Sequence, residues 1–241
     1  MLFRTSQEFE RHSDNLAAIK RGLTQLERAH KQAIRRNDLA AVETLARMHV
    51  LAVGMLAECR LRQVLADPNG FNDRERMLVG RAKSQVNKWL DALEFAIRRH
   101  YSVLMHRAID QHSIGRPEFL RFQEIQKLLN GDLRPVIEDR NKAAHGQWVW
   151  CLKSGKDNEF LSDPSPKILN YCEIESRRKL ITIVGDLVHL LVVSRPGFDK
   201  HYDALVRRLD DARSGLPGSD YPQFVAQLRA SRGRSRAGLK T

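Results

Sequence analysis

The feature that most constrains the fold is a series of long stretches in which apolar residues recur every three or four positions. This spacing matches one turn of an α-helix, so each stretch predicts a helix with one buried face. The first helix is predicted over 7–36, with His12 and His30 as packed, hydrogen-bonded residues of its apolar seam. That seam is formed by Phe9, His12, Leu16, Ile19, Leu23, Leu26, His30 and Ala33.

The same reading predicts further helices with breaks at polar, Gly-rich and Pro-rich turns. Asn130 and Gly131 are expected to end one helix, and Asp132 is a possible cap for the next, which has Pro135 in its first turn. The most apolar helix, 173–194, is expected to lie at the centre and to end at Arg195-Pro196-Gly197. The predicted helices after the first are 38–66, 73–112, 117–129, 132–145, 173–194, 199–213 and 219–230.

The pattern changes after Gly146. Residues 147–152 alternate between polar and apolar and are followed by a turn-like stretch, so a small β-hairpin is predicted over 147–162. The predicted fold is therefore all-α, an antiparallel helical bundle with a hairpin inserted after the helix at 132–145. We expect a bundle over 1–195, a helical extension over 196–230 and a disordered basic tail over 231–241.

Composition narrows the class of protein. The 241 residues carry a formal net charge of +12, and five of these charges lie from Arg229 onward, where there is no acidic residue, so the body is basic as well. A basic balance favours a nucleic-acid partner. Three cysteines without a CxxC pair indicate a reducing, cytoplasmic compartment. No apolar run approaches 18 residues, so no membrane association is expected. No metal or cofactor motif is present.

One short run, from Arg140 to Gly146, breaks the helical pattern. Arg140 falls on the apolar stripe of its helix, where a guanidinium is costly unless a partner or ligand meets it. Asn141 and His145 are four residues apart, so they flank the same stripe, and Gly146 suits the position that ends a helix. The alternative is structural: an arginine in an ion pair and a histidine that caps carbonyl groups.

The chain resembles the HEPN superfamily over about 5–195. The resemblance lies in the run Arg140-Asn141-x-x-x-His145-Gly146, which is similar to that family's Arg-x4–6-His signature, and in the basic helical context around it. The resemblance implies a helical bundle that dimerises so that two motifs face one cleft. It implies a metal-independent endoribonuclease of the toxin or phage-defence type, with no cofactor. Its partners would be RNA, a second copy and an antitoxin or regulatory protein. The residues expected to bind RNA are Lys142, Arg232, Arg234 and Arg236.

The chemistry of the motif fits that activity. Metal-free RNA cleavage needs a group that moves a proton at the 2′-hydroxyl or the leaving 5′-oxygen, which histidine does near neutral pH. It also needs a cation at the phosphorane, which arginine supplies. In that case substrate phosphate is the only full partner for the Arg140 charge, so replacing Arg140 with alanine is expected to leave the fold as stable or more stable. The alternative functions are a non-catalytic HEPN module that binds a protein or nucleotide, and a basic nucleic-acid-binding protein.

Overall fold

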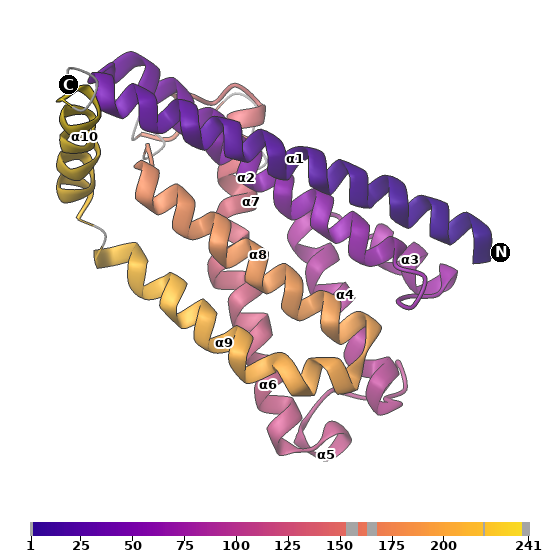
Figure 1. The fold of residues 1–241 in the computed structure, drawn as a ribbon. Coiled ribbons are helices and arrows are strands. Elements are labelled where there is room, and N and C mark those ends of the chain that lie inside the picture. The colour runs from indigo at the N-terminus through magenta and orange to yellow at the C-terminus, as the bar shows by residue number, and fades with distance from the viewer. Residues whose placement is uncertain (1, 153–158, 163–167, 219, 238–241) are drawn as a thin grey trace.

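The computed structural model describes residues 2–152, 159–162, 168–218 and 220–237, with side chains described over 6–214 and 220–230 within those ranges. Over these residues the chain is all-α, as predicted, and has no β-strand (Figure 1). Its elements are α1 (Leu2–Arg36), α2 (Leu39–Ala66), α3 (Asp73–Gly80), α4 (Gln85–Tyr101), α5 (Gln111–Ile114), α6 (Arg116–Leu128), the π-helix η1 (Leu129–Leu133), α7 (Arg134–Ala144), α8 (Tyr171–Val193), α9 (Arg195–Gly218) and α10 (Tyr221–Ala237).

The two longest helices, α1 and α2, lie side by side in opposite directions (Figure 1). The chain reverses at Asn37, which adopts a left-handed φ of 57°. Asp38 then caps α2, because its carboxylate accepts a hydrogen bond from the amide of Ala41 at 3.0 Å. Within this pair, α2 forms the surface on which α7 and α8 pack.

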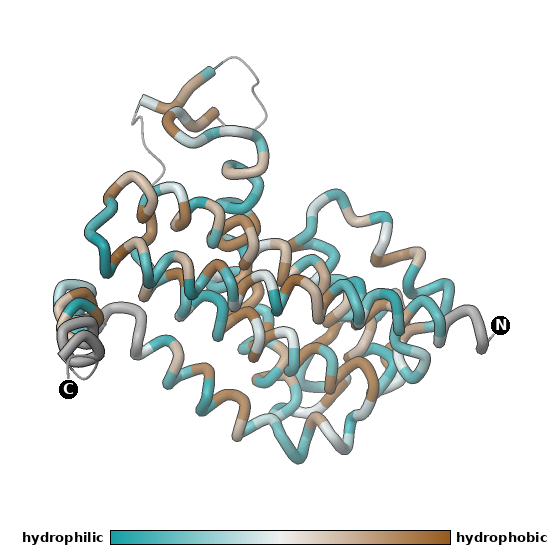
Figure 2. The backbone as a smooth tube through the Cα atoms, turned by 45° about the horizontal axis from the view of Figure 1, so that its top comes forward, coloured by the Kyte–Doolittle hydropathy of each residue, from teal (hydrophilic) through white to brown (hydrophobic). Residues whose placement is uncertain are grey.

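Helix α8 is the central helix, as its apolar sequence predicted. It packs against α2, α4 and α9, and Figure 2 shows hydrophobic segments that alternate with hydrophilic ones along the helices of the bundle. Ser194 adopts an extended conformation that ends α8, and α9 begins at once with Pro196 in its first turn, so the proline suits the start of a helix. The residues that fill the core from α8 are Leu180, Ile181, Val184, Leu187, Val188, Leu191 and Val192.

The single helix predicted over 73–112 is wrong, because this region consists of the separate helices α3, α4 and α5. Ser84 begins α4 by accepting a hydrogen bond from the amide of Asn87. Ser102 ends α4 with a left-handed φ of 53°. Asp110 then caps α5. Serine and aspartate compete with helical hydrogen bonds through their own side chains, and here that local chemistry outweighs the apolar periodicity.

The predicted break at Asn130-Gly131 is also wrong. Both residues lie in η1, a π-helical turn that joins α6 to α7. Asp132 does not cap α7, because its carboxylate instead accepts a hydrogen bond from Arg213 of α9 at 2.5 Å. Pro135 lies in the first turn of α7, as predicted. The extra residue of a π-turn re-aims a helix without ending it, and such turns often lie at functional sites.

The segment after α7 stands off the helical body (Figure 2). One antiparallel bridge joins Leu152 to Phe160, and the amide of Leu161 donates to the carbonyl of Cys151 at 2.8 Å. Residues 153–158, which would form the turn, lie outside the described residues. The β-hairpin over 147–162 therefore stays a prediction.

One further expectation differs from the structure. Helix α10 is helical as far as Ala237, whereas no regular structure was expected from Ser231 onward. Helix α2 is long and apolar enough, by length and composition, to cross a membrane, although no uninterrupted apolar run was found in the sequence. Core helices of soluble proteins also satisfy that criterion, and α2 packs against α1, α7 and α8.

Candidate active site

Arg140 reaches its position because α7 crosses α2 at a glycine. A Cβ atom placed on Gly54 would lie 2.2 Å from Cβ and 2.4 Å from Cγ of Arg140, which is far inside van der Waals contact. The arginine stem therefore rests directly on the α2 backbone. Such an approach is open only to a residue without a side chain.

The Arg140 guanidinium has protein partners. One terminal nitrogen donates to Glu58 Oε2 of α2 at 2.9 Å, and the other donates to Asn141 Oδ1 at 3.0 Å. The other carboxylate oxygen of Glu58 accepts from Arg62 at 2.8 Å, so one carboxylate joins two arginines. Nε of Arg140 is buried and has no hydrogen-bond partner among the described residues. The Arg140 side chain is 30% exposed, so it is also open to a ligand.

The expectation that substrate phosphate is the only partner of Arg140 is therefore wrong, because Glu58 forms an ion pair with the Arg140 guanidinium. Removing Arg140 breaks an ion pair and leaves Glu58 with Arg62 alone, so a gain in stability is no longer expected. The sequence contained one hint of this partner. Glu58 and Arg62 are four residues apart on α2, a spacing that places opposite charges on the same side of a helix.

A cavity of about 490 Å³ lies between α1, α2 and α7, and Arg140 forms part of its wall. The sequence analysis missed this cavity, because its walls come from three helices that are far apart in the chain. His12, expected to pack within the seam of α1, instead borders the cavity and is 23% exposed. The polar side chains of the lining are those of His12, Asn15, Glu58, Cys59, Arg62 and Arg140.

His145 lies at the end of the same helix as Arg140 but does not line this cavity. It is exposed, and its side chain forms no hydrogen bond or ion pair with the described residues. Gly146 follows with a left-handed φ of 71°, and its amide donates to the carbonyl of Ala143. The amide of Gln147 donates to the carbonyl of Lys142. This is the glycine-terminated helix end that the sequence predicted.

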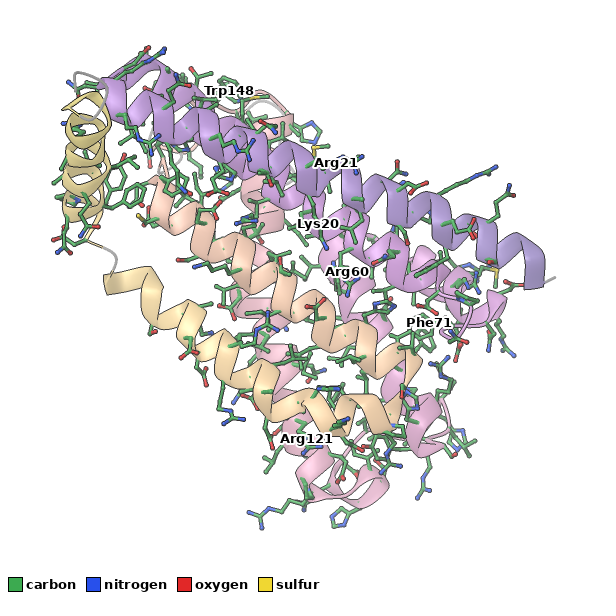
Figure 3. The ribbon with its side chains drawn as sticks, viewed as in Figure 1. Lys20, Arg21, Arg60, Phe71, Arg121 and Trp148 are labelled. Carbon is green, nitrogen blue, oxygen red and sulfur yellow. The ribbon has the colours of Figure 1, made fainter. Side chains whose placement is uncertain are left out.

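Lys142, the one predicted RNA-binding residue whose side chain is described, does not line this cavity. Lys142 is 3.9 Å from Asp139 and borders a second, smaller cavity of about 50 Å³ beside Trp148. The Trp148 indole donates to the carbonyl of Ala143 at 3.0 Å, which holds the following segment against α7. Figure 3 labels Trp148, together with Lys20 and Arg21 on α1. The side chains of Arg232, Arg234 and Arg236 lie outside the described residues. No group of three metal-ligating side chains occurs within the described ranges.

A second titratable cluster lies buried near the start of α8. His30 and His49 are both fully buried with their rings 5.9 Å apart, and the ring of Tyr171 lies 5.3 Å from that of His30. His49 Nε2 is 3.2 Å from Glu175, but neither ring has a hydrogen-bond partner among the described residues, so the hydrogen bond predicted for His30 is wrong while its packing is confirmed. Burial, followed by the nearby His49, lowers the pKa of His30 to about 4.

No family model matches this chain, and no curated protein or solved structure is significantly similar to it. The function therefore has to be inferred from the chemistry and geometry of the residues themselves.

Proposed function

We propose that this chain is a metal-independent endoribonuclease in which Arg140 binds the scissile phosphate and His145 transfers a proton. The observation that carries the proposal is the setting of Arg140. Its guanidinium is held by Glu58 and Asn141, remains 30% exposed and borders a cavity of about 490 Å³. A fixed, accessible fork of N–H donors is the group that a phosphate requires.

The residues near Arg140 suit an anionic substrate. Arg62 places a second guanidinium at the same cavity, and the whole chain carries a net charge of +12. In the proposed reaction Arg140 stabilises the charge that develops on phosphorus, and Asn141 orients Arg140. His145, which is exposed at the end of α7, is free to contact substrate. Lys142 and the basic residues of α10 would add salt-sensitive contacts to the RNA backbone.

The finer features of the proposal rest on the resemblance to the HEPN superfamily. The antiparallel helices before the motif and the apolar helix after it agree with such a bundle. We further propose that the chain forms a homodimer with the two motifs at one cleft and acts as a toxin or phage-defence effector in the cytoplasm, restrained by an antitoxin or regulatory protein. Light scattering at micromolar concentration tests the dimer, and a strict monomer that retains activity would count against it.

A second candidate function is a non-catalytic HEPN module that binds a protein or nucleotide. The observation that favours it is the Glu58 carboxylate, which already occupies both Arg140 and Arg62, while His145 lies outside their cavity. Under this alternative Arg140 serves mainly to join α7 to α2. Cleavage activity distinguishes the two functions directly.

The test is incubation of the purified chain with total RNA in a chelator. We expect His145→Ala and Arg140→Ala to lose on the order of 10²–10⁴-fold in cleavage rate, the range for removal of an acid–base or charge-stabilising group. Arg140→Lys should not restore cleavage, because an ammonium cannot reproduce the guanidinium fork. The products should end in 2′,3′-cyclic phosphate.

His106→Ala and Arg74→Ala, at exposed positions outside the motif, serve as matched controls that should cleave normally. A wild-type chain that cuts no RNA would support the non-catalytic module. If His145→Ala folds and cuts at the wild-type rate, the assignment of the reaction to this motif is wrong.

A further inference from the structure

Metal-free cleavage of RNA requires two proton transfers, one from the attacking 2′-hydroxyl and one to the leaving 5′-oxygen. The motif supplies one histidine for each chain, which would leave the second transfer to a partner copy. The structure offers another histidine within the same chain. His12 of α1 borders the cavity that Arg140 lines, although 128 residues separate them in the sequence.

We propose that His12 is a further catalytic residue and donates the proton to the leaving 5′-oxygen. This inference rests on the proposed ribonuclease function. In this reaction the 2′-oxygen bonds to phosphorus as its proton passes to His145, and the bond between phosphorus and the 5′-oxygen breaks. The 5′-oxygen then takes the proton from His12, which gives a 2′,3′-cyclic phosphate and a 5′-hydroxyl, and solvent resets both rings.

The setting of His12 suits a proton donor. Its side chain is 23% exposed and borders the cavity, so substrate can reach it. Nε2 also lies 3.9 Å from Glu8 Oε1, whereas His145 has no such partner among the described residues. In the proposed reaction the donor role falls to His12, which borders the cavity of Arg140, and the acceptor role to His145.

The part of α1 that carries His12 is held against α2. The hydroxyl of the next residue, Ser13, accepts a hydrogen bond from Gln63 of α2 at 2.9 Å. Gln63 in turn accepts from Arg60, and Arg60 pairs with Asp186 of α8 at 2.7 Å (Arg60 is labelled in Figure 3). This chain of contacts fixes α1 against α2 at the level of the cavity. A catalytic group on a rigid helix holds its geometry better than one on a loop.

Arg140 and Arg62 complete the cavity as a phosphate site. Glu58 orients both guanidinium groups and is therefore a positioning residue. A phosphate that enters would meet two guanidinium groups and the imidazole of His12 in one cavity. By contrast, the other histidine pair in the chain, His30 and His49, is fully buried and cannot contact a polymer.

The test uses the full chain, in chelator, with a synthetic RNA oligonucleotide that contains one wild-type cut site. A second oligonucleotide carries sulfur in place of the 5′-oxygen at that site, because a thiolate leaves without needing a proton. We expect His12→Ala to lose 10²–10⁴-fold on the oxygen substrate and to regain most of the wild-type rate on the sulfur substrate. His145→Ala should be impaired on both substrates.

The proposed role of His12 is wrong if His12→Ala cleaves at the wild-type rate, or if it loses the same factor in rate on both substrates. The proposed ribonuclease function would still hold in that case, provided that His145→Ala is inactive. If Arg140→Ala and His145→Ala both cut normally, the proposed function itself fails. His106→Ala should match the wild type on both substrates. His12→Gln, which preserves the size of the side chain, replaces His12→Ala if thermal melting shows that the alanine variant does not fold.

Discussion

The closest approach between α2 and α7 gives the sharpest test of the packing that positions Arg140. In Gly54→Ala the new methyl group would lie 2.2 Å from the Arg140 Cβ, so the two helices must separate. Overpacking of this kind costs about 1–3 kcal/mol. Alanine also favours a helix over glycine by about 1 kcal/mol, which offsets part of the cost. Because an approach of 2.2 Å is far inside contact, the cost should lie toward the upper end of that range, and we expect Gly54→Ala to destabilise the chain by up to about 2 kcal/mol.

Gly22→Ala is the matched control. Gly22 lies on the exposed side of α1, and a Cβ placed there would meet nothing within 4 Å apart from its chain neighbours and the backbone of its own helix. Only the helix propensity changes, so this variant should gain about 0.5–1 kcal/mol. A domain of this size shifts its melting temperature by roughly 2–4 °C per kcal/mol. Calorimetry or urea unfolding should therefore move the two variants in opposite directions.

The opposite signs make the prediction strict. If Gly54→Ala is as stable as Gly22→Ala, then α7 does not lie against α2 at this glycine and the position of Arg140 is wrong. The same variant also probes the site, because displacement of α7 moves Arg140 away from Glu58. We expect cleavage by Gly54→Ala to fall more than its loss of stability explains when both are measured well below its melting temperature.

Other predictions concern charge and pH. Glu58→Gln removes the negative charge between Arg62 and Arg140. When it is combined with the inactivating His145→Ala, we expect the double variant to bind fluorescently labelled RNA several-fold more tightly than His145→Ala alone. An unchanged affinity would show that Glu58 does not compete with phosphate. The pKa of His30 is about 4 in the folded chain, which is lower than its ordinary value of 6.5. This difference contributes ~3 kcal/mol to the free energy of unfolding, and the contribution is present above pH 6.5 and is lost as the pH falls toward 4. Urea unfolding of His30→Leu between pH 7 and 4 should show a weaker pH dependence than the wild type, and an equal dependence would contradict this role. Deletion of residues 231–241 should leave the fold intact and weaken RNA binding most at low salt, whereas a truncated chain that fails to fold would show that this segment is structural.

The sequence alone determined the helical class, the central helix and the end of the motif helix. These follow from local chemistry: the apolar periodicity of α8, the proline in the first turn of α7, and the left-handed glycine at 146. Its errors were also local. Ser84 and Asp110 capped helices inside a region that periodicity predicted as continuous, and η1 carried the chain through Gly131 without a break.

The tertiary structure alone decided what surrounds Arg140. The sequence showed an arginine on an apolar stripe and could not show that Glu58, 82 residues away, would meet it, because that contact depends on the crossing of α7 over α2 at Gly54. His12, which its helical spacing had assigned to a packed seam, borders the same cavity as Arg140. Periodicity tells which face of a helix is apolar, but only the packing of three helices determines which residues of that face border a cavity.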